Sequence, residues 1–413
     1  MYFRELNLDD YDALMENLRT SYPRRPPEAD ERRAAYIKQE LISREQGVFV
    51  GYFDQNDTLV ASMELFEFDM CFKGKQIPMG GVGYVATNFL RKKEKAAKAL
   101  FEYATDYFLK KGIVLCALYP FNYSFYKKMG FGFATENYMF NMTPESIIRG
   151  DNKANLSYCR PEDREEVLDF YSRYAQVTHG MCINRSNDNT RIFRDNQVVI
   201  CRKDGRITGY LCFRLVPVDL HVDKITDMVV SEMVYQDRET LNQFLTFLAS
   251  QSDQIKRIRL YTTDPYVYYL SNDPDNGLNT AYNNGIQHLA HMCGGSMMKV
   301  LDLRAFFRQN DSFEEPVGSP IYVKLDIQDS FNKSNSGPVT LKIEGNKMEV
   351  VQNPHTDVIL TGDISDFTSF VLGSVPLVKL IEYSRLKISD EKYIPILQRC
   401  LGYEKKPVCF SYF

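Results

Sequence analysis

Residues 80–98 have the sequence GGVGYVATNFLRKKEKAAK, in which an apolar, glycine-rich run precedes a basic cluster. The run at 80–87 predicts a strand, and apolar positions from about residue 93 to residue 111 recur at helical spacing. Cations at a helix N-terminus oppose the helix dipole, so they need another justification. A bound pyrophosphate supplies one, because backbone N–H groups there hold phosphate; a solvated basic helix start is the alternative. The four charges belong to Arg91, Lys92, Lys93 and Lys95.

The elements around this stretch alternate between helix and strand over the first 150 residues, which predicts an α/β domain with a mixed sheet. Amphipathic helices are expected at 8–21 and, after a proline-containing loop, up to about residue 44. A short helix is expected at 122–129. The expected strands are 47–53, 58–68, 72–77, 113–119 and 137–141.

Two further segments follow, residues 151–297 and residues 298–413. The second segment repeats the order of elements of the first, with a hairpin turn at 203–205, a strand at 224–234 and a helix at 237–252, so we expect a degenerate internal repeat. The third segment has an α+β pattern. After a strand and a helix near residue 298, its expected strands are 321–327, 337–344, 347–351 and 358–361, with a turn at 344–346, and its expected helices are 364–372, 375–383 and 393–401.

Length and composition limit the classes of protein to consider. At about 150 residues per domain, 413 residues suggest two or three domains. The net charge of −4 gives no field that attracts nucleic acid. No run approaches the ~18 apolar residues of a membrane span, and the acidic N-terminus is unlike a signal peptide. Nine cysteines without a CxxC pair favour reduced thiols in a cytoplasmic protein.

A second motif lies downstream, Asn122-Tyr-Ser-Phe-Tyr126-Lys-Lys-Met-Gly130-Phe131. Together with the strand, basic turn and helix, it resembles the GNAT family of acetyl-CoA-dependent N-acetyltransferases. The resemblance implies that Tyr126 is the general acid that protonates the departing thiolate. The family's turn is usually Arg-x-x-Gly-x-Gly/Ala; Arg91 and Ala96 match, whereas Glu94 replaces the glycine. The implied cofactor positions are Val85, Ala86 and Thr87 for the pantetheine arm, Lys93, Glu94, Lys95, Ala96, Ala97 and Lys98 for the pyrophosphate, and Phe121 and Asn122 for the other side of the arm.

In its length and three parts, the whole chain is similar to the Eis-like branch of that family. The similarity implies two GNAT-like mixed-sheet domains, the second degenerate, followed by a sterol-carrier-like α+β domain. It also implies assembly into oligomers, and a terminal carboxylate that enters the first domain's site as general base; here this is the carboxylate of Phe413. The apolar tail of Val408, Phe410 and Tyr412 fits a docked chain end, because chain ends are normally polar and frayed. An ordinary final strand is the alternative.

The same resemblance implies an acceptor that is a primary amine of a small polycationic molecule, such as an aminoglycoside, or of a lysine. The alternative function is binding of an apolar ligand or lipid, with silent GNAT domains. A backbone N–H at Val85 is expected to stabilise the thioester oxygen, Arg24 and Arg25 to border the acceptor, and Tyr36 to form an aromatic wall. His288 and His291 share an expected helix face but lack a fourth ligand, so we expect no metal site.

Overall fold

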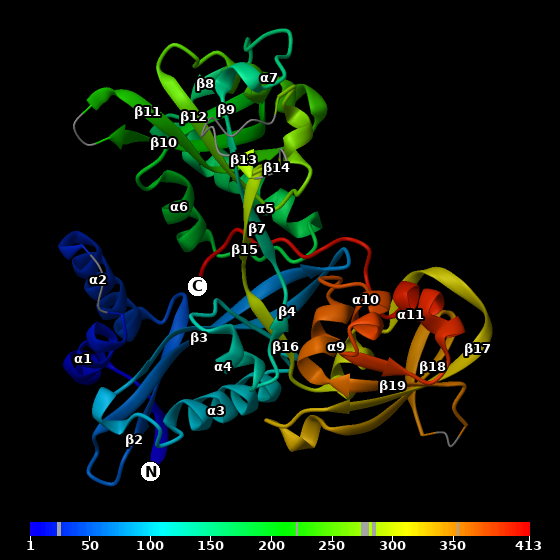
Figure 1. Cartoon of the computed structure of the whole chain (residues 1–413). Coiled ribbons are helices and arrows are strands. Elements are labelled where there is room, and N and C mark those ends of the chain that lie inside the picture. Colours follow the sequence, from blue (N-terminus) through cyan, green and yellow to red (C-terminus); the bar gives the residue numbers. More distant parts are fainter. Residues whose placement is uncertain (23–25, 220–221, 274–280, 283–285, 353–354) are drawn as a thin grey trace. The chain divides into compact units, whose positions relative to one another are not determined.

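The computed structural model (Figure 1) describes residues 1–22, 26–219, 222–273, 281–282, 286–352 and 355–413. These residues form two compact units. The first unit contains residues 1–134, 296–407 and 412–413, and the second contains residues 135–295 and 408–411. No described helix is long and apolar enough to cross a membrane.

The first unit begins with a mixed sheet of seven strands, in the order β1-β2-β3-β4-β5-β16-β6. Neighbours are antiparallel except β4 and β5, which run parallel. A parallel pair needs a crossover, and the helix α3 supplies it. The strands are β1 (Tyr2–Glu5), β2 (Gly47–Phe53), β3 (Leu59–Phe72), β4 (Lys75–Thr87), β5 (Leu115–Leu118), β6 (Gly132–Phe133) and β16 (Met297–Val300).

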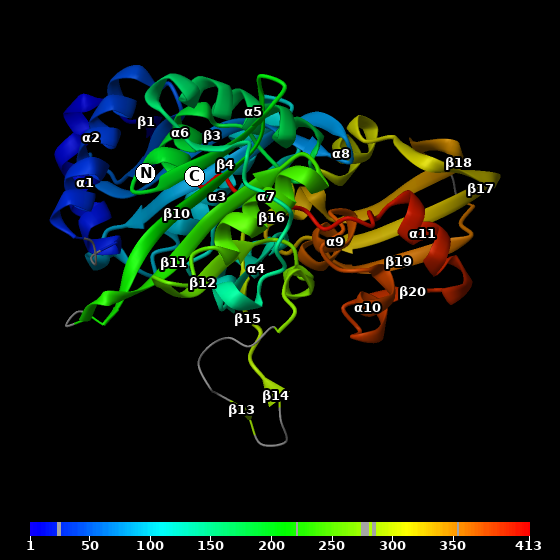
Figure 2. The same cartoon turned by 90° about the horizontal axis from the view of Figure 1, so that it is seen from above.

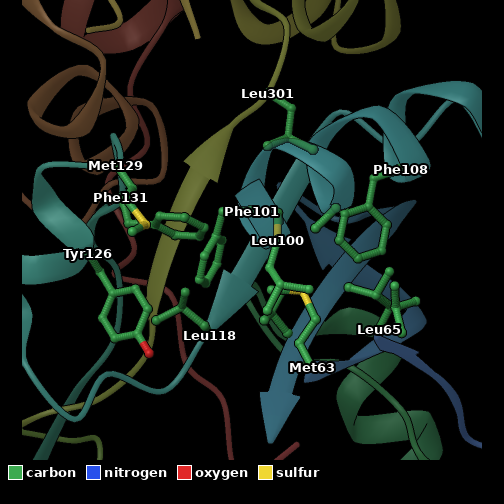
Figure 3. Packing of buried hydrophobic residues seen from close by; sticks show 14 of the residues in the cluster. Met63, Leu65, Leu100, Phe101, Phe108, Leu118, Tyr126, Met129, Phe131 and Leu301 are labelled. Carbon is green, nitrogen blue, oxygen red and sulfur yellow. The ribbon is translucent and has the colours of Figure 1, made fainter. Parts of the chain in front are cut away.

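Four helices accompany this sheet: α1 (Tyr11–Ser21), α2 (Pro27–Ser43), α3 (Ala96–Lys110) and α4 (Tyr123–Lys127). Short 3-10 turns, η1 (Leu8–Asp10) and η2 (Phe89–Arg91), precede α1 and α3. The helix α2 has proline at its first position and ends at Arg44 in a left-handed conformation. The buried residues of α3 recur every three or four positions, so one face of this helix enters the core. Figure 3 shows this core, where Leu100, Phe101 and Phe108 pack with Met63, Leu65 and Leu118 of the strands.

The second unit contains a sheet in the order β15-β7-β12-β11-β10-β9-β8. When the second sheet is read from β8, its strand order corresponds to that of the first sheet. The strands β11 and β12 again form a parallel pair, and the connection between them contains a helix. The expected internal repeat is therefore present in the topology. The strands are β7 (Glu136–Met142), β8 (Leu156–Tyr158), β9 (Gln197–Lys203), β10 (Arg206–Asp219), β11 (Val222–Tyr235), β12 (Ile255–Thr262) and β15 (Ala290–Gly294), with the separate pair β13 (Ala281–Tyr282) and β14 (Ile286–Gln287); the helices are α5 (Arg164–Val177), α6 (Arg185–Phe193) and α7 (Arg238–Ala249), with 3-10 turns η3 (Pro144–Ser146), η4 (Pro161–Asp163) and η5 (Val267–Leu270).

Two strands pair differently from the sequence-based expectation. The strand expected at 137–141 in the first segment is β7, which pairs with β12 and β15 of the second sheet. The strand expected to open the third segment is β16, which pairs with β5 and β6 of the first sheet. Each strand lies just after a point where the chain passes between the units, and local sequence does not identify the sheet that a strand joins.

The remainder of the first unit is an α+β domain with a four-stranded sheet in the order β18-β17-β19-β20, which Figure 2 shows together with α9 to α11. The expected strands 337–344 and 347–351 are one strand, β18, because Gly345 has a φ of 58° at an irregularity in the pairing with β17 rather than in a hairpin turn. The elements are α8 (Leu303–Gln309), β17 (Ser312–Gln328), η6 (Lys333–Asn335), β18 (Gly337–Val351), β19 (Val358–Asp363), α9 (Ile364–Val371), α10 (Leu377–Glu382), β20 (Leu386–Ile388), η7 (Glu391–Tyr393) and α11 (Ile394–Cys400).

The histidine pair, metal-binding groups and the arginine loop were also considered in the sequence. His291 lies on the strand β15, with His288 just before it, so the expected helix face that would join them is wrong. Among the described residues no three His, Cys, Asp or Glu side chains gather in a metal-binding group. Arg24 and Arg25 lie outside the residues that the structure describes.

Candidate active site

The strand β4 departs from regular pairing on both of its sides near residue 84. Its parallel pairing with β5 runs from Gly80 to Val82 and ends there. On the other side, Glu64 of β3 pairs with Gly83 while Ser62 pairs with Ala86, so β4 carries one extra residue at this point. Tyr84 at this bulge has a φ of 46°, in the left-handed region.

This irregularity frees the edge of β4 that faces away from β3. Val85, Ala86 and Thr87 lie beyond the last pair with β5, so their backbone groups on that edge are not used in a β4–β5 ladder. The Val85 carbonyl oxygen accepts a hydrogen bond from the Tyr22 hydroxyl at 3.0 Å. An extended polar chain can add to such an edge through backbone hydrogen bonds, as a peptide adds to a sheet edge.

The loop between β4 and α3 leaves the helix N-terminus without a side-chain cap. We expected the helix from about Lys93, but it begins at Ala96, because Lys93 and Lys95 have φ values of 70° and 63° and cannot join a right-handed helix. Lys95 occupies the N-cap position and its side chain makes no capping hydrogen bond. The first backbone N–H groups of a helix lack partners within the helix, and the dipole makes this end attractive to anions.

Glu94, which replaces the glycine of the family's turn, does not have a left-handed φ; the left-handed residues are its two neighbours. Its carboxylate accepts from Arg91 Nε at 2.8 and 3.0 Å, and Arg91 Nη1 donates to Asp54 at 2.7 Å. The hydrogen bond from Arg91 lowers the pKa of Asp54, and Asp54 in turn raises the pKa of Arg91. The negative charge of Glu94 is therefore directed at a guanidinium, while exposed Lys92, Lys93, Lys95 and Lys98 surround the loop.

The corresponding helix of the second domain has a different N-terminus. The Asp237 side chain at the N-cap of α7 accepts from the Thr240 backbone N–H at 2.8 Å, and this hydrogen bond lowers the pKa of Asp237. A carboxylate at this position satisfies the helix and repels phosphate. The two domains thus differ at this helix N-terminus, which is capped by a carboxylate in the second domain and uncapped in the first, a difference that N-cap residues in the sequence could have indicated.

Tyr126 lies on α4 with its ring in the core and 3% of its surface exposed. Its ring makes edge-to-face contacts with Phe101, Phe121 and Phe131 at centroid distances of 5.8, 5.4 and 6.2 Å. Figure 3 shows its hydroxyl at the end of the ring that points away from Met129. Within the described residues, no partner hydrogen-bonds to this hydroxyl. Burial raises the pKa of Tyr126, so the phenol is protonated at neutral pH.

The two other predicted residues beside Tyr126 have different environments. Asn122 is the N-cap of α4, and its side-chain oxygen accepts from the Phe125 N–H at 3.1 Å. Phe121 is 71% exposed although it touches Tyr126, which is unusual for a phenylalanine. Asn122 therefore fixes the turn that presents Tyr126, and Phe121 offers an apolar surface next to it.

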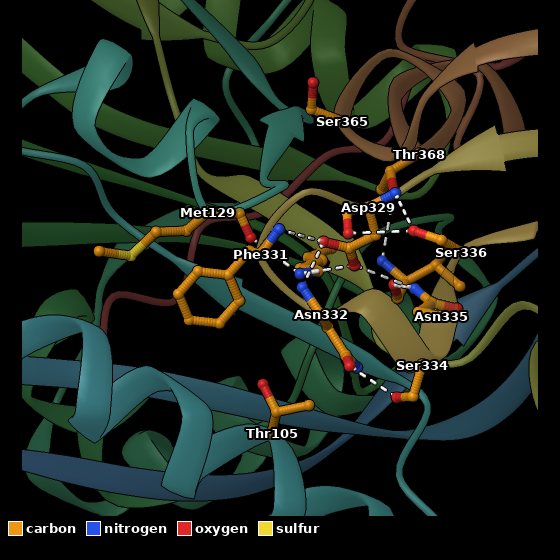
Figure 4. A network of polar contacts seen from close by, with 12 residues as sticks. Thr105, Met129, Asp329, Phe331, Asn332, Ser334, Asn335, Ser336, Ser365 and Thr368 are labelled. Atoms are coloured by element: carbon orange, nitrogen blue, oxygen red, sulfur yellow. Dashed lines mark hydrogen bonds and ion pairs between the residues drawn. The ribbon is translucent and has the colours of Figure 1, made fainter.

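A buried lysine supports the turn after Tyr126, and sequence reasoning missed it. Lys299 of β16 donates to the Met129 carbonyl oxygen at 2.8 Å and pairs with Asp329 at 2.8 Å. Figure 4 shows Asp329 held in a network with the Phe331 and Asn332 N–H groups and Asn335. Burial lowers the pKa of Lys299. A charged residue inside the apolar run 297–301 was the available signal, because lysine is almost never fully buried unless paired.

Phe413 packs against β3 and β4 on the face of the sheet opposite α3, since a Cβ added at Gly81 or Gly83 would meet Phe413 whereas one added at Gly80 would meet Phe108 of α3. Its ring contacts Phe66, Phe68 and Tyr119 at centroid distances of 6.0, 4.9 and 5.4 Å. A Cβ added at Gly83 would be 3.1 Å from the Phe413 carbonyl carbon. The terminal carboxyl group therefore lies against β4 directly before the bulge. Phe413 touches Tyr119 and Tyr126 touches Phe121, so the three-residue segment after β5 contacts both proposed catalytic residues.

Aromatic rings from α2 and from the end of α1, and a buried carboxylate of β3, adjoin the bulge. Tyr36, the expected aromatic wall, stacks on Tyr84 at 5.8 Å, and Tyr22 meets Tyr84 edge-on at 6.5 Å. The Tyr36 hydroxyl donates to Glu64 at 2.7 Å. Sequence reasoning did not find Tyr84 or Glu64; a glutamate at an inward position of an apolar strand was the signal for the latter.

Family models match three parts of the chain. Residues 2–134 and residues 176–289 each match a family model described as an acetyltransferase (GNAT) domain, and residues 300–410 match a sterol carrier protein domain. The search of curated proteins found no match. These matches show that the chain contains two GNAT acetyltransferase domains and a sterol carrier protein domain.

Solved structures with the same fold extend over the whole chain. A probable N-acyltransferase from Enterococcus faecalis has a TM-score of 0.80 at 18% identity, covering 100% of this chain and 99% of its own. A GCN5-related N-acetyltransferase from Anabaena variabilis has a TM-score of 0.80 at 16% identity, and Eis1 from Mycobacterium abscessus 0.78 at 15%, each covering 100% of both chains. With two GNAT domains and a sterol carrier protein domain, the chain has the Eis-like GNAT architecture.

Proposed function

We propose that the first domain binds acetyl-CoA and transfers its acetyl group to a primary amine. The observation that carries this proposal is the uncapped N-terminus of α3 behind two left-handed lysines, Lys93 and Lys95. A left-handed conformation costs a residue with a side chain roughly 1–2 kcal/mol, and such strain concentrates at functional sites. The N–H groups from Lys93 to Lys98 would take the pyrophosphate, and the free edge at Val85, Ala86 and Thr87 would pair with the pantetheine arm.

The reaction needs one proton removed and one supplied. The amine attacks the thioester carbon, the C–N bond forms, the C–S bond breaks, and the thiolate leaves. The carboxylate of Phe413 removes the amine proton through a water, and the Tyr126 phenol protonates the sulfur. The Val85 N–H stabilises the negative charge that develops on the thioester oxygen. The burial of Tyr126 supports its role, because a phenol that stays protonated can donate.

The acceptor in this proposal is a polycationic small molecule of the aminoglycoside type, or a lysine. A carboxylate beside the site would attract a cationic amine. The alternative, an apolar-ligand or lipid-binding protein with silent GNAT domains, becomes the better account only if acetyl-CoA fails to bind.

Calorimetric titration with acetyl-CoA tests the cofactor site, with two charge reversals at opposite ends of α3. Lys95→Glu places a negative charge beside the proposed pyrophosphate and should weaken binding at least tenfold, about 1.4 kcal/mol. Lys110→Glu, on the exposed last turn, should leave the affinity within twofold. Absence of binding at millimolar acetyl-CoA, or equal effects of both variants, contradicts the proposal.

The base is tested by extending the chain beyond Phe413. An extension replaces the terminal carboxylate with a peptide bond and should lower turnover at least tenfold, while the same residues added before Met1 should not. Thiol release, followed over a panel of amines, measures both. Full activity of the extended protein would remove the carboxylate from the mechanism.

A further inference from the structure

Two buried carboxylates, one on α2 and one on β3, lie near each other next to the proposed active site. Glu40 on α2 is 1% exposed and Glu64 on β3 is 0% exposed. They lie beside the same residue, Gly47: its N–H lies 3.4 Å from Glu40 Oε2, and a Cβ added to it would be 2.9 Å from Glu64 Oε1. Ionised carboxylates so close and so buried are costly unless a cation or a proton neutralises them.

In each carboxylate, one oxygen accepts a hydrogen bond and the other accepts none from the described residues. Glu64 Oε1 accepts from the Tyr36 hydroxyl at 2.7 Å, and Glu40 Oε2 accepts from the Gln46 N–H at 2.9 Å. Glu64 Oε2 and Glu40 Oε1 have no hydrogen-bond partner among the described residues. A buried acceptor without a hydrogen bond is costly, so two such atoms in one cluster call for a donor that the described residues do not supply.

Aromatic rings line the side of this cluster that is nearest the bulge. Tyr36 and Tyr84 are half-buried and stacked, and Tyr22 contacts Tyr84. The faces of such rings attract cations, and a carboxylate behind them adds charge and hydrogen-bond acceptors. Burial, with the nearby Glu40, raises the pKa of Glu64 well above its usual range, which is the response of a carboxyl group that lacks a cation.

We propose that Glu64, together with Glu40 and Tyr36, binds a second ammonium group of the acceptor. This inference rests on the proposed function, since it assigns the acceptor class for the same site. Glu64 pairs directly with Gly83, against which the Phe413 carboxyl group lies. The Cβ positions of residues directly opposite on paired strands lie roughly 4.5–5.5 Å apart; with the length of the Glu64 side chain added, we place the ammonium site on the order of 5–8 Å from the reacting amine. This spacing fits a short aliphatic diamine unit, alone or within a larger polyamine.

The test compares acceptors that differ only in the second ammonium group. For the wild-type protein, kcat/KM for 1,4-diaminobutane should exceed that for butylamine at least 30-fold. Glu64→Gln is nearly isosteric and should raise the KM for 1,4-diaminobutane by at least tenfold while leaving the values for butylamine within twofold. Glu67→Gln is the matched control, because Glu67 lies on the same strand with an exposed side chain paired to Lys111.

Tyr36→Phe, which removes the hydroxyl that holds Glu64, should raise the KM for the diamine and not that for butylamine. Equal use of both amines by the wild-type protein overturns the inference. A fall of kcat for both amines in Glu64→Gln overturns it as well, because that result assigns Glu64 to proton transfer or to packing. If no amine is acetylated, the proposed function fails instead, and titration of 1,4-diaminobutane into wild-type and Glu64→Gln protein still decides the ammonium site.

Discussion

The substitution Gly83→Ala perturbs the proposed catalytic carboxylate through a single added methyl group. Gly83 has an ordinary backbone conformation, so alanine fits the strand without strain in φ. The new Cβ would lie 2.9 Å from a ring carbon of Phe66 and 3.1 Å from the carbonyl carbon of Phe413. Carbon atoms in contact prefer about 3.5–4.0 Å, so one of the two neighbours must move by roughly 0.5–1 Å.

The neighbour that moves should be Phe413. Phe66 is 1% exposed and stacked on Phe68 at 5.6 Å, whereas Phe413 is partly exposed. A misplacement of about 1 Å can cost about 10²-fold in rate, so we expect kcat to fall by roughly 10- to 100-fold, or about 1.4–2.7 kcal/mol. The affinity for acetyl-CoA should stay within twofold, because the loop before α3 is untouched.

Steady-state kinetics at saturating acetyl-CoA, with calorimetric titration of the cofactor, measures both quantities. Gly318→Ala is the control, since a Cβ added there meets nothing within 4 Å. A melting curve for each variant separates misplacement from unfolding. Wild-type kcat in a folded Gly83→Ala protein would refute the idea that the carboxylate at this position takes part in the reaction.

Three further substitutions test the remaining parts of the site. Tyr126→Phe should lower kcat by about 10²–10⁴-fold at unchanged acetyl-CoA affinity. Because burial raises the pKa of Tyr126, ionisation of this phenol should not lower the wild-type kcat below pH 10. A fall of kcat below pH 10 that is present in the wild-type protein and absent from Tyr126→Phe would contradict the assignment. Glu94→Ala removes a negative charge beside the loop and should tighten acetyl-CoA binding a few-fold by calorimetry; weaker binding would mean that Glu94 orders the loop through Arg91. Lys299→Met leaves Asp329 buried without its cation and should destabilise the fold by about 3–5 kcal/mol in urea unfolding; stability near that of the wild-type protein would show that the pair contributes little.

The local elements of this protein follow from its sequence because their signals are local. The helical spacing of apolar residues predicted α3, and this helix has one buried face. The loop between Thr87 and this helix contains the basic residues Arg91, Lys92, Lys93 and Lys95. The hairpin at 203–205 joins β9 to β10 as its glycine indicates. The helix start was placed too early, since backbone conformation at Lys93 and Lys95 has no signature in residue type; lysine is not a residue associated with positive φ.

Pairing between distant segments could not be predicted in the same way. The strands β7 and β16 have ordinary strand sequences, and the sheet that each joins depends on long-range contacts that become known only in the folded chain. The expected hairpin at residues 344–346 failed for a related reason, because β17 is long enough to pair with both halves of β18 and leaves only an irregularity at Gly345.

The sequence by itself determined the order of elements, the amphipathic helices and the basic turn, because each rests on residues a few positions apart. The tertiary structure alone decided that Lys299 supports the turn of Tyr126, that Phe413 lies against Gly83, and that the buried Glu40 and Glu64 both lie beside Gly47. The physical reason is that burial and charge pairing depend on neighbours that are far apart in the chain.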